Sequence, residues 1–441
     1  DNERIKENYM EPFENDKNQN TEPVMAENMT SAPAKRYEGK SFIFSDIPSQ
    51  EKIIQVLCTT FGLDPEGMGD TLVLHNGDIE IRLAVASESA GEKAEEFIKR
   101  QVEGTCDHFY QVKTGVVDVK TNLLYQIGRA RSFVLVEYAF DVEDEEDIED
   151  KKTMIEDMFV SILNDLEGII LIQNQDEKED GMFCSGENGE KLLILSDKGG
   201  SAFTRYLPYQ EPDLKAGKDI TQEQVDRRMR TMQTLIGNAI YVPGWLPAVA
   251  PASQITCPSL EETAQRALAI MGVAIYSECL LDEKQGMEKA QNFLMDYIDN
   301  NNTQDYFSPK EWKYLHDTAP DRKEILSFLR QYESLHVVEW ALGLVEELGF
   351  PDHPCNPADL VKLLRNGTSI SKIMAKSRPK SPRELLDACD LISCLEWSCI
   401  NARRHELPEP VGMKTGVVRE WHKALNWLTG HGQWDEVRTN S

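Results

Sequence analysis

The chain has 441 residues, of which 40% are hydrophobic and 28% are charged, and its formal net charge is −29. This composition is typical of a globular protein of two or three domains, and no run approaches the ~18–20 apolar residues that a membrane-spanning helix needs. Because an acidic surface repels phosphate backbones, the charge argues against general nucleic-acid binding.

Residues 1–40 are rich in Asn, Glu, Lys and Pro and contain few apolar side chains. Such a segment cannot bury enough surface to offset the entropy lost on ordering, so we predict a disordered or loosely packed leader.

Residues 41–205 have the pattern of an α+β domain. The first expected elements are a strand at 42–44, a helix at 51–61, a hairpin of 71–75 and 79–83, and helices at about 89–104 and 117–130. Asn76-Gly77 lies between the two alternating runs, and both residues tolerate the positive φ of a type I′ turn.

The order strand, helix, hairpin then recurs. The expected elements are a strand at 133–140, a helix at about 149–166, a strand at 168–172 and a hairpin that turns at Asn188-Gly189 into 191–195. The recurrence suggests an internal repeat, as in a ferredoxin-like sandwich. The acidic residues 141–150 lack the ligand spacing and central Gly of a calcium loop, so we interpret them as a solvated loop.

Residues 206–220 carry three Pro or Gly among polar neighbours and are the predicted linker. Beyond them, residues 221–441 predict an all-helical domain. Four helix starts have a capping signature, in which a hydroxyl accepts from a backbone N–H and an acid or amide three residues on reaches back. They are Thr221 to Gln224, Ser259 to Glu262, Ser308 to Glu311 and Ser381 to Glu384.

The cysteines and histidines show no metal-binding pattern. Nine cysteines are scattered without a Cys-x-x-Cys pair, and the eight histidines do not cluster. Cys389, Cys394 and Cys399 recur every five residues in one expected helix, which suits neither zinc nor neighbouring disulfides. We interpret the cysteines as buried free thiols in a reducing cytoplasm, and expect no metal and no cofactor.

No established catalytic signature is present in the sequence: there is no Gly-x-Ser-x-Gly, phosphate-binding Gly-Lys-Ser/Thr loop, His-Glu-x-x-His or dinucleotide glycine fingerprint. The best basic cluster, Arg227-Arg228-Met229-Arg230, is short, and we interpret it as a solvated helix face.

The helix expected from Pro382 to about Arg404 carries an apolar stripe and a second stripe with Asp387, Asp390, Trp397 and Arg404. Carboxylates three residues apart share a helix face and could hold a metal or act as acid and base. Bundle metal sites usually add a Glu-x-x-His, which is absent here. We therefore favour an ion pair between one of these carboxylates and an Arg of a neighbouring helix.

Glu339 lies in an apolar helical run and is expected to be buried, so it needs a partner. Arg266 is a plausible one, and a core salt bridge is favoured over a pocket carboxylate of raised proton affinity. Trp340 and Trp397 are expected to be core or interface anchors, and His422 a packing or capping residue. With Arg404, these three are the candidate binding residues.

Several stretches of the C-terminal half form an ordered set. They are Gly244-Trp245-Leu246-Pro247, residues 261–269, residues 339–343, residues 382–387, and residues 424–428 with Trp434-Asp435. Over about residues 227–437 this set resembles the bacterial domain-of-unknown-function family numbered four-two-seven-two. The resemblance implies a fold and a bacterial source but no activity, and the N-terminal half resembles no known family.

We expect a non-enzymatic cytoplasmic binding protein, of the immunity or stress-accessory type, with a protein partner, because acidic proteins often pair with basic ones. One alternative is an uncommon hydrolase or transferase that uses Glu339, Asp387, Asp390 and Arg266, which requires the four to converge on one open pocket. The other is a small-ligand sensor whose tryptophans stack on the ligand. The sequence leaves the oligomeric state open.

Overall fold

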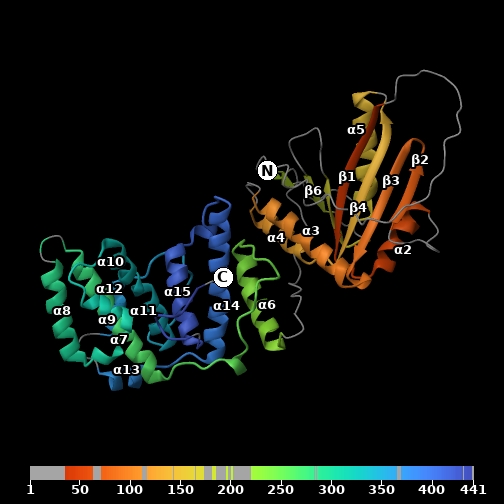
Figure 1. The fold of residues 1–441 in the computed structure, drawn as a ribbon. Helices are drawn as coiled ribbons and strands as arrows, with labels where there is room; N and C mark the ends of the chain where they lie inside the picture. Colours follow the sequence, from red (N-terminus) through yellow and green to blue (C-terminus); the bar gives the residue numbers. More distant parts are fainter. Residues whose placement is uncertain are drawn as a thin grey trace, which may run out of the picture. The chain divides into compact units, whose positions relative to one another are not determined.

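The computed structural model describes residues 35–62, 71–111, 117–142, 144–163, 165–172, 181–184, 195–196, 200–201, 220–282, 284, 286–364, 369–430 and 432–439. They belong to two compact units, one within residues 1–213 and one within residues 214–441 (Figure 1). Residues 1–34 of the predicted leader, the turn predicted at Asn188-Gly189 and the predicted linker up to residue 219 lie outside the described residues.

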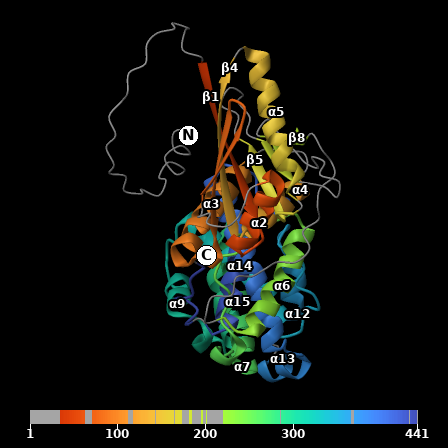
Figure 2. The ribbon, with the colours of Figure 1, turned by 90° about the vertical axis from the view of Figure 1, so that its right-hand side faces the viewer.

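The N-terminal unit is built on an antiparallel sheet with the strand order β2-β3-β4-β1-β5-β6-β7-β8. The strands are β1 (Lys35–Ser45), β2 (Thr71–Asn76), β3 (Ile79–Ser87), β4 (Ser132–Val142), β5 (Gly168–Ile172), β6 (Gly181–Cys184), β7 (Leu195–Ser196) and β8 (Gly200–Ser201). β1 and β4 form its centre and pair from Lys35↔Val142 to Ser45↔Ser132 (Figure 2).

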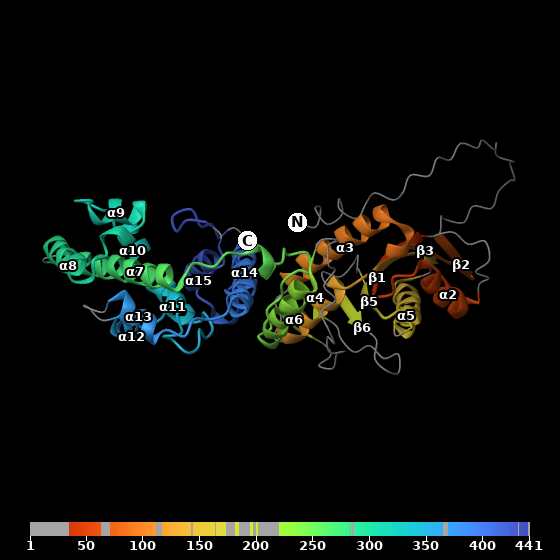
Figure 3. The same cartoon turned by 90° about the horizontal axis from the view of Figure 1, so that it is seen from below.

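Alternate side chains of the central strands face two helical layers. On one face, Ile43 and Val134 join a core with residues of α2 (Gln50–Phe61) and α5 (Glu145–Ser161). On the other face, Phe133 contacts Phe97 of α3 (Glu92–Tyr110), which packs against α4 (Val117–Gly128). Figure 3 shows the sheet between these two pairs of helices. The predicted α+β class is confirmed.

The order strand, helix, hairpin occurs twice, as β1-α2-β2-β3 and as β4-α5-β5-β6, but the two copies pair differently. β4 lies beside β3, the second strand of the first hairpin, whereas β1 lies beside β5, the first strand of the second hairpin. In a symmetric duplicated sheet, the strand beside β1 and the strand beside β4 would occupy equivalent positions in their two hairpins. The recurrence therefore describes the order of elements and not a symmetric sheet.

Three local predictions in this unit are corrected. β1 begins at Lys35, inside the predicted leader, because it pairs with β4 over its whole length. Asn76 pairs with Ile79, so Gly77 and Asp78 form the turn, and of these two only Gly77 has a positive φ, which excludes type I′. The acidic residues 145–150 are the first turns of α5, where negative charge favours the helix, and not a loop.

The C-terminal unit is helical, as predicted. Its α-helices are α6 (Gln222–Gly237), α7 (Leu260–Leu280), α8 (Gly286–Asn301), α9 (Pro309–Leu315), α10 (Arg322–Leu329), α11 (Gln331–Ala341), α12 (Pro357–Leu363), α13 (Ile370–Lys376), α14 (Pro382–Arg404) and α15 (Thr415–Leu428). All four predicted capping boxes are formed, at the starts of α6, α7, α9 and α14.

Helix α7 is the core of this unit. It is buried around most of its circumference and packs against α8, α10, α11 and α13. α11 also packs against α15, α15 packs against α14, and α14 packs against α6 (Figures 1 and 3). The junction of α6 with α14 therefore lies at the end of this series of helices remote from α8.

Within the described part of the chain, no helix combines the length and the hydropathy needed to cross a membrane. The eight cysteines described there all have free thiols.

Candidate functional site

The basic run on α6 faces the acidic residues of α14. Arg227 and Arg228 are only 1% and 3% exposed, so the prediction of a solvated helix face is wrong for both. Arg228 lies four residues before Met232 and seven before Leu235, which are buried on the same side of α6. Burying two guanidinium groups requires counter-charges and hydrogen-bond acceptors, and carboxylates on α14 supply counter-charges.

Asp390 and Arg228 form a buried bidentate ion pair. The Nε and Nη2 atoms of Arg228 donate to the carboxylate of Asp390 at 3.0 and 2.8 Å. Arg228 also donates to the backbone oxygens of Leu246 at 2.9 Å and Pro247 at 2.8 Å. Asp390 is 1% exposed, so this pair is desolvated and geometrically fixed.

Asp387 forms a second, partly exposed pair with Arg230. The Nε and Nη2 atoms of Arg230 donate to its two carboxylate oxygens at 3.1 and 2.7 Å. The side chains of Arg230 and Asp387 are 38% and 32% exposed. The hydrogen bond to Asp387 raises the pKa of the Arg230 guanidinium. The prediction that an Arg of a neighbouring helix pairs with these carboxylates therefore holds at both positions.

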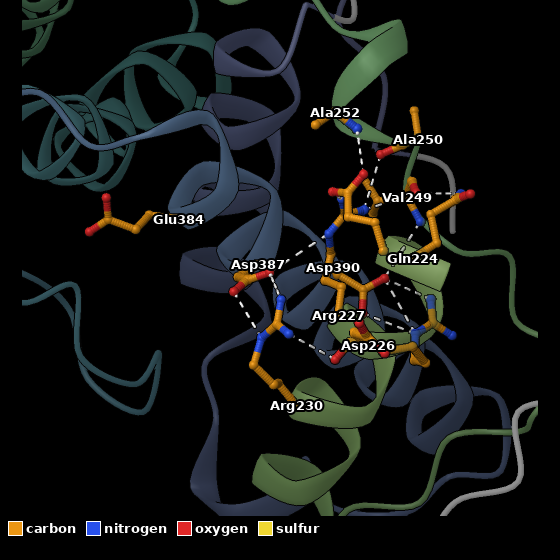
Figure 4. Close-up of polar contacts among 12 residues, drawn as sticks. Gln224, Asp226, Arg227, Arg230, Val249, Ala250, Ala252, Glu384, Asp387 and Asp390 are labelled. Atoms are coloured by element: carbon orange, nitrogen blue, oxygen red, sulfur yellow. Dashed lines mark hydrogen bonds and ion pairs between the residues drawn. The ribbon is translucent and has the colours of Figure 1, made fainter. Parts of the chain in front are cut away.

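The same network holds the backbone of one segment between α6 and α7, residues 246–252, which we call the clamped segment (Figure 4). Besides the two bonds from Arg228, Arg227 donates to the oxygens of Val249 at 3.1 Å and Ala250 at 3.0 Å. The remaining bonds are Gln224 Nε2 to Val249 O at 2.9 Å, Val249 N to Asp390 Oδ1 at 3.5 Å, and Ala252 N to Glu223 Oε2 at 3.0 Å. Side chains from two helices thus replace the backbone partners that a strand or helix would provide.

The clamped segment follows an exposed tryptophan. Trp245 is 51% exposed, and its ring lies edge-on to that of Trp397 on α14, with the centroids 6.1 Å apart. Trp397 is partly buried, whereas Arg404 is exposed at the end of α14, two turns beyond Trp397. An aromatic pair on a fixed backbone is typical of an interface anchor.

Glu339 and Arg266 do not pair with each other. Arg266 of α7 instead contacts Glu311 of α9 at 2.5 Å, and both side chains are buried. Glu311 is also the reaching-back residue of the α9 capping box, which fixes it beside Arg266. The prediction of a Glu339–Arg266 salt bridge is wrong because the packing of α9 on α7 supplies a closer carboxylate.

Glu339 is fully buried, and neither of its carboxylate oxygens has a hydrogen-bond partner among the described residues. Burial raises the pKa of Glu339 to about 9. The carboxyl group is therefore protonated and neutral at pH 7. The four residues of the hydrolase alternative thus occupy three separate environments: Asp387 and Asp390 at α6–α14, Arg266 at α7–α9, and Glu339 in the interior of α11.

The remaining candidate binding residues lie within the helical core. Trp340 is 8% exposed, and the ammonium group of Lys380 lies 5.5 Å from its ring centroid. His422 of α15 is buried and hydrogen-bonded through Nδ1 to the Glu396 carboxylate of α14. Both residues join neighbouring elements, as expected of packing residues.

A cavity of about 210 Å³ lies among the starts of α7 and α14 and the ends of α11 and α15. Its lining is mainly apolar, with Lys380 as the charged residue, and it includes none of the candidate site residues and no tryptophan. The cavity therefore supports neither the hydrolase nor the tryptophan-stacking sensor. Among the described residues, no group of three or more His, Cys, Asp or Glu is arranged to hold a metal ion.

Comparison with protein families gives one match, and it lies in the helical unit. Residues 227–437 match the domain of unknown function DUF4272. The DUF4272 match begins at Arg227 itself and includes all of α14, so it contains most of the network around the clamped segment. The N-terminal half matches no family, and no curated protein and no solved structure matches the chain.

Sequence reasoning missed Trp245, Arg228 and Glu311 as site or core residues. A signal existed for Arg228, since its spacing to Met232 and Leu235 places it on the apolar face of α6. No comparable signal existed for the exposure of Trp245, because the sequence Gly244-Trp245-Leu246-Pro247 fits a buried turn equally well.

Proposed function

We propose that this protein is a non-enzymatic binding protein that acts through a protein partner. The proposal rests on how the charged side chains are paired at the α6–α14 junction. Asp387 and Asp390, which could have served acid–base chemistry, are engaged by Arg230 and Arg228. Arg228, together with Arg227, also fixes the clamped segment beside an exposed tryptophan. A pre-ordered surface loses little entropy on association, which favours binding.

We infer a cytoplasmic location, which the free thiols of the eight described cysteines support, because oxidising compartments tend to pair such thiols. Within that setting, a role of the immunity or stress-accessory type is our working hypothesis. It requires one dominant protein partner.

The test is affinity purification of the tagged full chain from cells of its source, with excess untagged chain as competitor. We expect one protein to be recovered in near-stoichiometric amount and to be lost on competition. The hydrolase or transferase alternative would replace this proposal if the wild-type chain turned over a compound from a substrate panel and the Asp387→Asn variant did not. Asp387 is partly exposed, so this variant should keep its fold.

A further inference from the structure

The surface around Trp245 is the part of the helical unit best suited to a partner. Between Arg230 and Glu261 the chain contains no charged residue, although 28% of the whole chain is charged. Within this stretch Gly244, Trp245 and Pro247 are exposed, and residues 248–250 are partly exposed. Of the charged side chains that bond to the backbone of the clamped segment, Arg227, Arg228 and Asp390 are buried. The exposed carboxylate of Glu223 reaches only Ala252, at the end of the segment. The result is an uncharged apolar strip on an otherwise acidic protein.

Two further observations indicate that the strip is built to be contacted. Trp245 keeps half of its surface in solvent although Trp397 lies beside it. Seven side-chain hydrogen bonds hold the backbone from Leu246 to Ala252. An exposed tryptophan on an ordered backbone combines a large apolar contact with a low entropic cost of binding.

We propose that Trp245, Trp397 and residues 246–250 form a docking surface for an apolar, uncharged segment of a basic partner protein. The inference rests on the proposed binding function and names its surface and partner chemistry. The strip itself offers no charge to pair, so the contacting segment must be apolar. The net charge of −29 attracts a basic protein and repels a second copy of this chain, which makes a different protein the favoured occupant.

The experiment places a photo-crosslinking amino acid, p-benzoylphenylalanine, at position 245 of the full chain in cells. A matched control carries it at position 295 on α8, where Met295 is 60% exposed and lies outside the docking surface. We expect an adduct with one protein from position 245 and none from position 295. The crosslinked peptide of that protein should be uncharged and apolar, and the protein as a whole should be basic.

Binding of the identified protein to purified chains then tests the energetics. Trp245→Ser should weaken it at least ~10-fold, as for a central aromatic anchor, whereas Met295→Ser should leave it unchanged. Thermal unfolding of both variants should match the wild type, because both side chains are exposed. Raising the salt concentration should weaken binding, since the attraction between the acidic chain and a basic partner is screened.

Three outcomes overturn the inference, and they can be told apart. An adduct between two copies of this chain would make the strip a self-association surface. A partner recovered equally by the wild type and by Trp245→Ser would leave the proposed function standing but place binding elsewhere. Recovery of no partner by either crosslinking or purification would remove the docking surface and the proposed function together.

Discussion

The unpaired carboxyl group of Glu339 makes a sharp prediction about pH. Its pKa is raised from 4.5 to about 9 by burial, so between these pH values the folded protein keeps a proton that the unfolded chain has lost. The native state then binds more protons, and the free energy of unfolding must fall as pH rises, by ~1.4 kcal/mol per pH unit. Below pH 4.5 Glu339 is protonated in both the folded and the unfolded state, so it no longer makes the free energy of unfolding depend on pH.

The substitution Glu339→Gln removes the titrating group while keeping its shape. Summed from pH 5 to pH 8, the linkage amounts to about 4 kcal/mol. We therefore expect the variant to match the wild type within about 1 kcal/mol at pH 5 and to exceed it by about 4 kcal/mol at pH 8. All seven tryptophans lie between residues 245 and 434, so tryptophan fluorescence during urea unfolding reports on the helical unit.

Glu311→Gln is the matched control, because Glu311 is an equally buried glutamate with a partner. Its removal leaves the guanidinium of Arg266 buried and unpaired, which should cost about 3–5 kcal/mol at both pH values. At pH 8, glutamine should therefore raise the free energy of unfolding at position 339 and lower it at position 311. If Glu339→Gln gave no gain at pH 8 over pH 5, Glu339 would have to be ionised and paired, and our account of the interior of α11 would be incorrect.

Three further predictions concern the junction of α6 with α14 and the end of α11. Asp390→Asn should destabilise the helical unit by about 3–5 kcal/mol in urea unfolding, since Arg228 would stay buried without a counter-charge; an unchanged unfolding midpoint would contradict the buried pair. Arg230→Ala should cost less than about 1 kcal/mol in the same assay, because its pair with Asp387 is partly exposed, and a larger loss would contradict that assignment. Gly343→Ala should destabilise the helical unit by about 1–3 kcal/mol or more and so lower its melting temperature. The φ of Gly343 is +70°, and an added Cβ would lie 2.0 Å from the backbone oxygen of Arg378. An unchanged melting temperature would refute this close approach.

Local features of the helical unit were predictable because neighbouring residues determine them. The start of α14 at Pro382, its capping box and its apolar stripe depend on spacings within one helix, and the sequence contains all of these. The hairpin of β2 and β3 was found for the same reason, although its turn is displaced by one residue. In each case, interactions over a few residues determine the structure.

Pairings between helices were not predictable in the same way. Arg266 had two buried glutamates available, and only the packing of α9 on α7 selects Glu311 over Glu339. The clamped segment is a similar case, because its backbone partners come from Arg228 and other residues of α6 and α14 that are remote in sequence. Such contacts depend on how helices cross, which hydrophobic periodicity leaves undetermined.

The clamps on residues 246–252 reach backbone atoms alone, and this separates the shape of the segment from its side chains. The acceptors used by Arg227 and Arg228 are main-chain oxygens, and every residue type carries one. Substitutions at positions such as Ala248 or Val249 should therefore change what the surface recognises while the path of the chain stays the same. Related proteins could diverge in specificity through these positions, and a randomised library restricted to them would keep a common scaffold from which new binders could be selected.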